Sequence, residues 1–157
     1  MGTRSLTTFV DNFTGKKIVV MYRQYDGYPS GHGKELAEFL DDLHIVNGIN
    51  MNDERTIANG MGCLSAQVVS HFKGDDIGHI YLHAPDTKDI GEQYIYTIYD
   101  DKDGVKIKVR DTYKNIDIFN GTIKDMKKWI TCVEEAINVN KLWDFVFVVS
   151  TYIIIFR

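Results

Sequence analysis

Apolar residues follow two different spacings along the chain, and the changes of spacing predict where strands and helices lie. Residues 17–25 contain a continuous apolar run and predict the first strand. Apolar residues at i, i+3, i+4 and i+7 predict a helix from Leu36 to Leu43, which Asn47-Gly48 ends. The same reasoning gives two further elements, a helix over 62–72 and a strand over 77–83.

Turn residues predict hairpins in the second half of the chain. Strands over 93–99 and 105–110 flank Asp103-Gly104, a dipeptide that favours a tight hairpin turn. Asn120-Gly121 follows a short strand and predicts a second hairpin. Five apolar positions then predict a last amphipathic helix: Met126, Trp129, Ile130, Val133 and Ile137. We therefore expect an α+β fold, an antiparallel meander packed against two to three helices.

A strongly apolar segment closes the sequence. Twelve of the fifteen residues from Leu142 to Phe156 are apolar or aromatic, and Asp144 is the single charge before Arg157. The run is shorter than a membrane-spanning helix requires and is rich in β-branched residues. We expect residues 1–141 to form one domain and residues 142–157 to form a buried strand or an interface. A membrane anchor and a poorly packed, self-associating tail are the alternatives.

Composition restricts the class of protein. The chain has 157 residues, enough for one domain with one main core. Its formal net charge of −4 argues against a protein that coats DNA, which needs a strong excess of basic residues. Two cysteines, Cys63 and Cys132, are too few for a disulfide scaffold and favour a reducing compartment. Residues 1–15 lack the apolar stretch of a secretory signal, so we expect a cytoplasmic protein.

The glycine-rich connection between the first strand and the first helix is the most suggestive segment. The start of a helix offers unpaired backbone N–H groups to an anion, and glycine lets a phosphate approach the backbone closely. We predict that this loop binds an anionic, nucleotide-like molecule. The arginine and lysine would pair with phosphate, a tyrosine would stack on a base, and the aspartate would orient the arginine. The predicted ligand-binding residues are Arg23, Tyr25, Asp26, Tyr28, Ser30, Gly31, His32, Gly33 and Lys34.

Hydrolysis of a nucleoside triphosphate is disfavoured at this loop. The phosphate-loop pattern G-x-x-x-x-G-K-[ST] is met at Gly33-Lys34. Tyr28 stands where the first glycine belongs, and Glu35 replaces the residue that holds magnesium. The simplest alternative is a tight strand-to-helix connection in which the glycines only turn the chain.

Other groupings are weaker. Asn59-Gly60-Met61-Gly62 precedes the second helix and is either a turn or a second wall of the same cleft. His79 and His83 share a strand face, but too few further ligands accompany them for zinc, so no metal or cofactor is predicted. Asp101-x-Asp103-Gly104 fails the calcium-loop pattern because Tyr99 occupies its first position. Lys106, Lys108 and Arg110 alternate outward and favour a solvated sheet face over a nucleic-acid surface.

One resemblance is added to these patterns. The run from Met21 to Lys34 (MYRQYDGYPSGHGK) resembles the opening motif of small proteins encoded by phages and some bacteria. Residues 58–63 and 91–94 resemble their later motifs, and the likeness spans about residues 17–110. It implies a virus or mobile element acting inside a host cell, and it brings no catalytic residues with it.

Three hypotheses follow. The first is a non-catalytic accessory protein that sequesters an anionic small molecule at the loop. The second is a structural or virion component that forms a homo-oligomer through the apolar C-terminal segment and a sheet edge. The third is a phosphoesterase that uses His32 as general acid or base. No second catalytic group is apparent in the sequence, so the expectation leans away from an enzyme.

Overall fold

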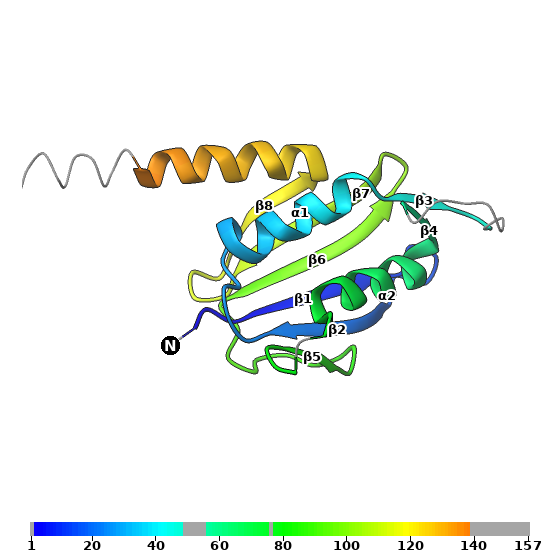
Figure 1. The fold of residues 1–157 in the computed structure, drawn as a ribbon, viewed down its shortest axis with the longest axis horizontal. Coiled ribbons are helices and arrows are strands. Elements are labelled where there is room, and N and C mark those ends of the chain that lie inside the picture. Colours follow the sequence, from blue (N-terminus) through cyan, green and yellow to red (C-terminus); the bar gives the residue numbers. More distant parts are fainter. Residues whose placement is uncertain (1, 49–55, 76, 139–157) are drawn as a thin grey trace, which may run out of the picture.

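The computed structural model describes residues 2–48, 56–75 and 77–138. Six strands form one mixed sheet in the order β5-β2-β1-β6-β7-β8 (Figure 1). Their bounds are β1 Ser5–Val10, β2 Lys17–Arg23, β5 Ile80–His83, β6 Tyr94–Asp101, β7 Gly104–Asp111 and β8 Ile116–Thr122. A separate two-stranded sheet pairs β3 (His44–Val46) with β4 (Ile57–Asn59). The α+β class is confirmed.

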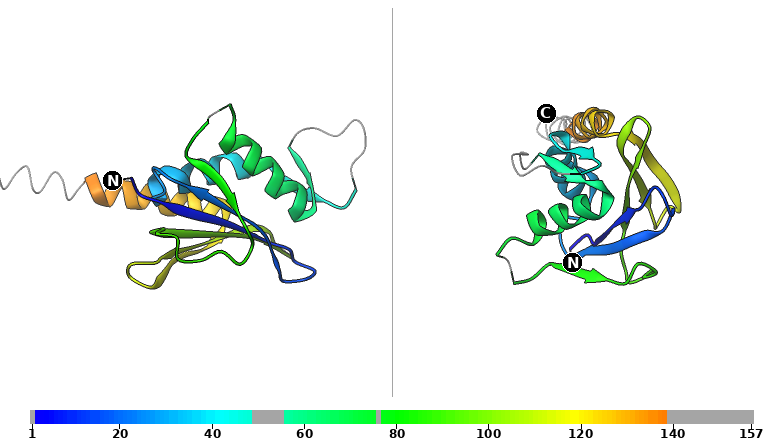
Figure 2. Two further views of the ribbon diagram at one scale, coloured as in Figure 1. Left: turned by 90° about the horizontal axis from the view of Figure 1, so that it is seen from below. Right: turned by 90° about the vertical axis from the view of Figure 1, so that its right-hand side faces the viewer.

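The helices lie on one side of the main sheet, as Figure 2 shows. They are α1 (Lys34–Asp41), α2 (Gly60–Lys73) and a helix over residues 123–138, and one wide helical turn, Pro29–Gly33, leads into α1. The main core lies between this layer and the sheet, with Leu36, Leu64 and Met126 packed beside Phe9 and Tyr96. Burial of apolar surface in this one core is the main stabilising contribution.

The first strand of the structure is β1, which precedes the strand over residues 17–25 that was predicted to be the first. β1 lies in the middle of the sheet, antiparallel to β2 and parallel to β6. The sheet is therefore mixed, and the β6-β7-β8 meander is its antiparallel part. The prediction missed β1 because Thr7 and Thr8 are buried on opposite faces, so the strand shows no apolar alternation.

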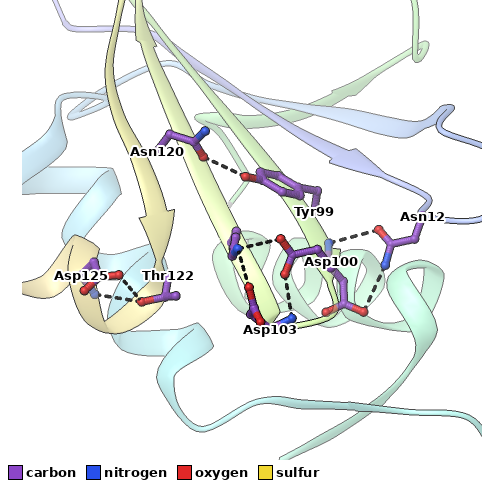
Figure 3. A network of polar contacts seen from close by, with 9 residues as sticks. Asn12, Tyr99, Asp100, Asp103, Asn120, Thr122 and Asp125 are labelled. Atoms are coloured by element: carbon purple, nitrogen blue, oxygen red, sulfur yellow. Dashed lines mark hydrogen bonds and ion pairs between the residues drawn. The ribbon is translucent and has the colours of Figure 1, made fainter.

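The predicted hairpin turn at Asn120-Gly121 is wrong. Both residues lie inside β8, paired with Lys108 and Ile107. The Asn120 amide oxygen accepts a hydrogen bond from the Tyr99 hydroxyl at 2.8 Å, from the far side of the strand β7 (Figure 3). The chain leaves β8 by starting a helix instead of turning back.

Thr122 starts that helix. Its hydroxyl oxygen accepts the Asp125 backbone N–H at 3.2 Å and donates to the Asp125 carboxylate at 2.7 Å (Figure 3). This arrangement satisfies an N–H group that the first helical turn leaves without an intrahelical partner. The helix over 123–138 thereby begins directly at the end of the sheet.

The hairpin at Asp103-Gly104 is confirmed. Asp101 pairs with Gly104 across the turn, and Gly104 has a φ of +97°, a conformation that glycine adopts without steric cost. Hydrogen bonds between Asn12 and Asp100 tie the β1–β2 turn to this hairpin (Figure 3).

The basic positions of β7 are paired with acidic side chains. Lys106 Nζ lies 2.6 Å from Asp101 Oδ2, and Asp117 binds both Lys108 at 2.8 Å and Arg110 at 3.0 Å. A phosphate backbone would have to displace these carboxylates, so the geometry fits a solvated sheet face.

Residues 142–157, for which a buried strand or an interface was predicted, lie outside the described residues. Within the part that is described, no helix is long and apolar enough to cross a membrane.

Candidate ligand-binding site

Arg23, the predicted phosphate-binding residue, is buried and already occupied. Its Nε donates to the Tyr25 carbonyl oxygen at 2.8 Å, and its guanidinium forms an ion pair with Glu35. Nη1 also lies 3.0 Å from His32 Nδ1. Glu35 therefore has the orienting role that was predicted for Asp26, whose side chain is exposed.

His32 is fully buried and bonded through both ring nitrogens. A guanidinium can only donate, so Nδ1 must be the acceptor and Nε2 must carry the proton. Nε2 then donates to Thr7 Oγ1 at 2.7 Å. Burial, and secondly the charge of Arg23, lower the pKa of His32 well below its usual value. The ring is neutral at physiological pH and lies edge-on to Phe72 and Tyr96.

The backbone N–H groups that were predicted to hold an anion are bonded within the loop. All four N–H groups over residues 31–34 donate to carbonyl oxygens, at 2.9 to 3.4 Å for the first three. Their acceptors are Asp26, Tyr28 and Gly31. A helix start binds anions only through N–H groups that remain unpaired. The interior of the loop therefore has the geometry of a tight strand-to-helix connection.

The glycines of the loop are required by packing. A Cβ on Gly31 would lie 2.5 Å from the Asp26 carbonyl oxygen and 2.9 Å from the Tyr28 ring. A Cβ on Gly33 would lie 3.2 Å from the Tyr96 ring. Tyr96 in turn donates its hydroxyl proton to the Gly27 carbonyl oxygen at 2.9 Å. The glycine-rich composition thus reflects close approach of aromatic rings to the backbone.

The other predicted residues point outward. Lys34 is exposed, and its Nζ pairs with Glu134 Oε1 at 3.3 Å, across to the helix over 123–138. The Tyr25 ring is exposed beside Gly2. Tyr28 and Ser30 lie on the outer face of the loop, where they line a cleft.

This cleft, which we call the aromatic cleft, has a volume of about 500 Å³. It opens where the loop, the sheet and the last helix meet. The residues that line it are Tyr28, Pro29, Ser30, Tyr94, Asp111, Lys114, Ile118, Trp129, Val133 and Ile137. Its size and its mostly apolar wall with a few polar groups are typical of small-molecule sites.

The rings of the aromatic cleft are held in place. Trp129 stacks on Phe119 with ring centroids 5.1 Å apart and an interplanar angle of 27°. Tyr28 lies over the backbone of Gly31. Burial, and secondly the Asp111 carboxylate, raise the pKa of Tyr94, so its phenol stays protonated.

The start of α2 lies at the opposite end of the sheet. A depression of about 450 Å³ there is lined by residues that include Asp11, Asp100 and Gly60. Ser5, at the start of β1, pairs with Arg23, at the end of β2, so α1 and α2 begin at opposite ends of β1. The two helix starts therefore do not share a cleft. The carboxylates of the second depression, with no lysine or arginine among its described lining residues, disfavour an anion there. Among the described residues, no group of three or more His, Cys, Asp or Glu could hold a metal ion.

The chain matches no protein-family model, and no curated protein or solved structure is significantly similar to it. Sequence reasoning missed Asp111, Lys114, Tyr94 and Trp129 as neighbours of the loop. Asp111 and Lys114 flank a turn without a hairpin dipeptide, and Trp129 was assigned only to a helix core. Strand pairing places Tyr94 beside Asp111, and packing of the last helix against the core places Trp129 near Tyr28.

Proposed function

We propose that this protein binds, without turning it over, a small anionic molecule with a planar ring, such as a nucleotide, in the aromatic cleft. The observation that carries the proposal is the convergence of Tyr28, Tyr94 and Trp129 around one opening of about 500 Å³. A context inside a host cell, in a virus or mobile element, rests on the motif resemblance alone.

Aromatic rings in fixed positions favour stacking of a planar ligand. A stacked base contributes about 1–3 kcal/mol, and every base offers a π-face. Trp129 is stacked on Phe119, and Tyr28 keeps 39% of its surface exposed. The ligand ring therefore gains contacts without ordering these side chains first.

Lys114 supplies the positive charge at the mouth of the cleft. Its side chain is 72% exposed, so it can turn toward an anionic group. The loop contributes Tyr28 and the Ser30 hydroxyl instead of its backbone N–H groups. We propose binding without turnover because the raised pKa of Tyr94 makes its phenol a poor proton donor or acceptor near neutral pH. Asp111 Oδ1 is likewise committed to backbone N–H groups.

Calorimetric titration with nucleoside monophosphates tests the proposal. Tyr28→Ala is expected to weaken binding at least fivefold, which corresponds to about 1 kcal/mol of lost stacking. Lys114→Ala is expected to weaken it about fivefold through the loss of a charge-assisted contact. Tyr113→Ala and Lys102→Ala are matched controls, because both residues are exposed and neither lines the cleft.

The expected result is that both controls bind like the wild type. The proposal is wrong if no nucleotide binds the wild type, or if each control weakens binding as much as its cleft variant. A ligand in the cleft is expected to quench the fluorescence of Trp129. Trp143→Phe removes the second tryptophan of the chain, so quenching that persists in this variant comes from Trp129.

The edge strand β5 favours self-association as a second candidate function. β5 pairs with β2 on one side and forms the end of the sheet on the other. Tyr81 and Leu82 keep 50% and 55% of their surface exposed there, and Ile77 is nearly fully exposed. Exposed apolar edge strands pair readily with other chains. If the protein stays monomeric at high concentration, this candidate function is wrong.

A phosphoesterase that uses His32 is not supported by the geometry. The ring has no solvent-exposed surface, and both nitrogens are bonded to Thr7 and Arg23. A general acid or base must lie within hydrogen-bond distance of the group that it protonates or deprotonates.

A further inference from the structure

The aromatic cleft contains a buried carboxylate. Asp111 ends β7, and only 3% of its surface is exposed. Its Oδ1 accepts the backbone N–H groups of Tyr113 at 3.0 Å and Lys114 at 3.1 Å. These two bonds hold the turn between β7 and β8 and fix the orientation of the carboxylate.

The second oxygen of this carboxylate keeps its capacity to accept a hydrogen bond. Asp111 Oδ2 lies 3.8 Å from Lys114 Nζ, which is beyond hydrogen-bond distance. Lys114 extends into solvent, so its charge is screened by water and shields the carboxylate little. A buried carboxylate oxygen gains most from an N–H donor and repels a carbonyl oxygen.

Tyr94 adds a second polar group beside Asp111. Its hydroxyl oxygen accepts a long hydrogen bond of 3.4 Å from the Gln93 amide. The phenol proton can then be donated to an acceptor atom of a ligand. The cleft thus combines a strong acceptor, a donor and stacking rings, which together distinguish ring edges.

We propose that Asp111 Oδ2 accepts the exocyclic amino group of a guanine-type base and excludes bases that carry a carbonyl at that position. This inference rests on the proposed function, since it assigns the ligand class of the same cleft. Guanine and xanthine are the informative pair, because guanine carries an amino group at C2 and xanthine carries a carbonyl there.

The variant Asp111→Asn isolates this contact. Two backbone N–H groups require an acceptor at the Oδ1 position, so the amide oxygen of the variant occupies it. The amide NH₂ then takes the place of Oδ2 and becomes a donor in the cleft. The shape of the side chain and the hydrogen bonds of the turn are retained.

Titration of the whole chain with guanosine and xanthosine monophosphates tests the inference. The wild type is expected to prefer the guanosine nucleotide by at least about tenfold, because a buried polar group left opposed to a like dipole is strongly disfavoured. Asp111→Asn is expected to reverse the preference. Asp117→Asn, a change of an exposed carboxylate outside the cleft, is expected to leave it unchanged.

A second measurement needs no variant. Inosine monophosphate lacks the 2-amino group, so the wild type is expected to bind it about tenfold more weakly than guanosine monophosphate. Equal affinity for the two nucleotides overturns the inference, whether or not Asp111→Asn folds. An unchanged preference in a folded Asp111→Asn overturns it as well.

Failure of this inference is distinguishable from failure of the proposed function. If the three nucleotides bind equally and Tyr28→Ala weakens all of them, the cleft binds nucleotides and Asp111 does not select them. If none of the three binds the wild type, both proposals are wrong.

Discussion

At the scale of single residues, the buried pair of Arg23 and His32 explains why the loop does not have the chemistry that its composition suggests. An arginine, a histidine and a lysine near three glycines are the usual components of a phosphate site. Here the arginine is neutralised by Glu35 and the histidine accepts from the arginine. The polar groups stabilise one another and leave no open anion site in the interior of the loop.

The burial of His32 predicts a dependence of stability on pH. Its pKa in the folded protein is depressed, so the unfolded chain binds the proton more readily. The free energy of unfolding is therefore highest above the unfolded pKa of about 6.5 and falls as the pH drops below it. Between pH 7.5 and 5.5 this one group is expected to remove up to about 1.4 kcal/mol, the value reached when the folded ring stays neutral throughout.

Urea denaturation at pH 7.5 and 5.5 measures this loss. His32→Asn is expected to lose less stability than the wild type over the same interval, by up to about 1.4 kcal/mol, whatever its stability at pH 7.5. His44→Asn, at an exposed histidine, serves as the control and is expected to behave like the wild type. Equal losses for the wild type and His32→Asn contradict a neutral buried ring. The same measurement on His32→Gln checks that the difference in stability loss does not depend on which residue replaces the histidine.

At the scale of elements, the apolar side of the helix over 123–138 stabilises its position, and its surface charges contribute little. Met126 and Ile130 are buried in the main core. Lys127 pairs with Asp41 at 2.6 Å on the surface, and the largest cause of the raised pKa of Lys127 is this hydrogen bond. Exposed ion pairs contribute little to stability, whereas a truncated core side chain leaves a cavity.

A comparison of neighbouring substitutions tests this division. Met126→Ala is expected to lower the free energy of unfolding by about 2–5 kcal/mol. Lys127→Ala, one position further along the same helix, is expected to leave it nearly unchanged. Urea denaturation at neutral pH gives both values. A loss for Lys127→Ala as large as that for Met126→Ala contradicts the assignment of the helix to the core.

At the scale of the whole molecule, the two edges of the sheet, β8 and β5, differ in character. At the β8 edge Phe119 stacks on Trp129 of the last helix, beside the aromatic cleft, whereas β5 forms an edge with exposed Tyr81 and Leu82. Ligand binding and self-association are therefore proposed for opposite edges of one sheet. The two proposed functions therefore use different surfaces.

Sedimentation velocity over a range of concentrations tests self-association. The wild type is expected to form oligomers that Leu82→Lys dissociates, because a charge on an edge strand opposes pairing with a second chain. Phe13→Lys, at an exposed aromatic residue of the β1–β2 turn, is the control and is expected to associate like the wild type. Deletion of residues 142–157 tests the contribution of the apolar segment. If the deletion dissociates the oligomer and Leu82→Lys does not, β5 is not the interface.

The sequence by itself determined the elements whose reasons are local. Asp103-Gly104 makes its hairpin because glycine tolerates the positive φ of the turn. Leu36 and Leu40 define the buried side of α1 because apolar residues at helical spacing must face a core. The turn at Asn120-Gly121 was predicted on equally local grounds, and pairing with β7 overrode it.

Only the tertiary structure decided the position of β1, the partners of Arg23 and the aromatic cleft. β1 is buried on both faces by elements that follow it in the chain, so its own residues show no pattern. Arg23 reaches Glu35, and Thr7 reaches His32, because β2 pairs with β1 and the helical turn Pro29–Gly33 carries the chain from β2 into α1. Contacts between residues far apart in sequence depend on strand order and register, which no local spacing encodes.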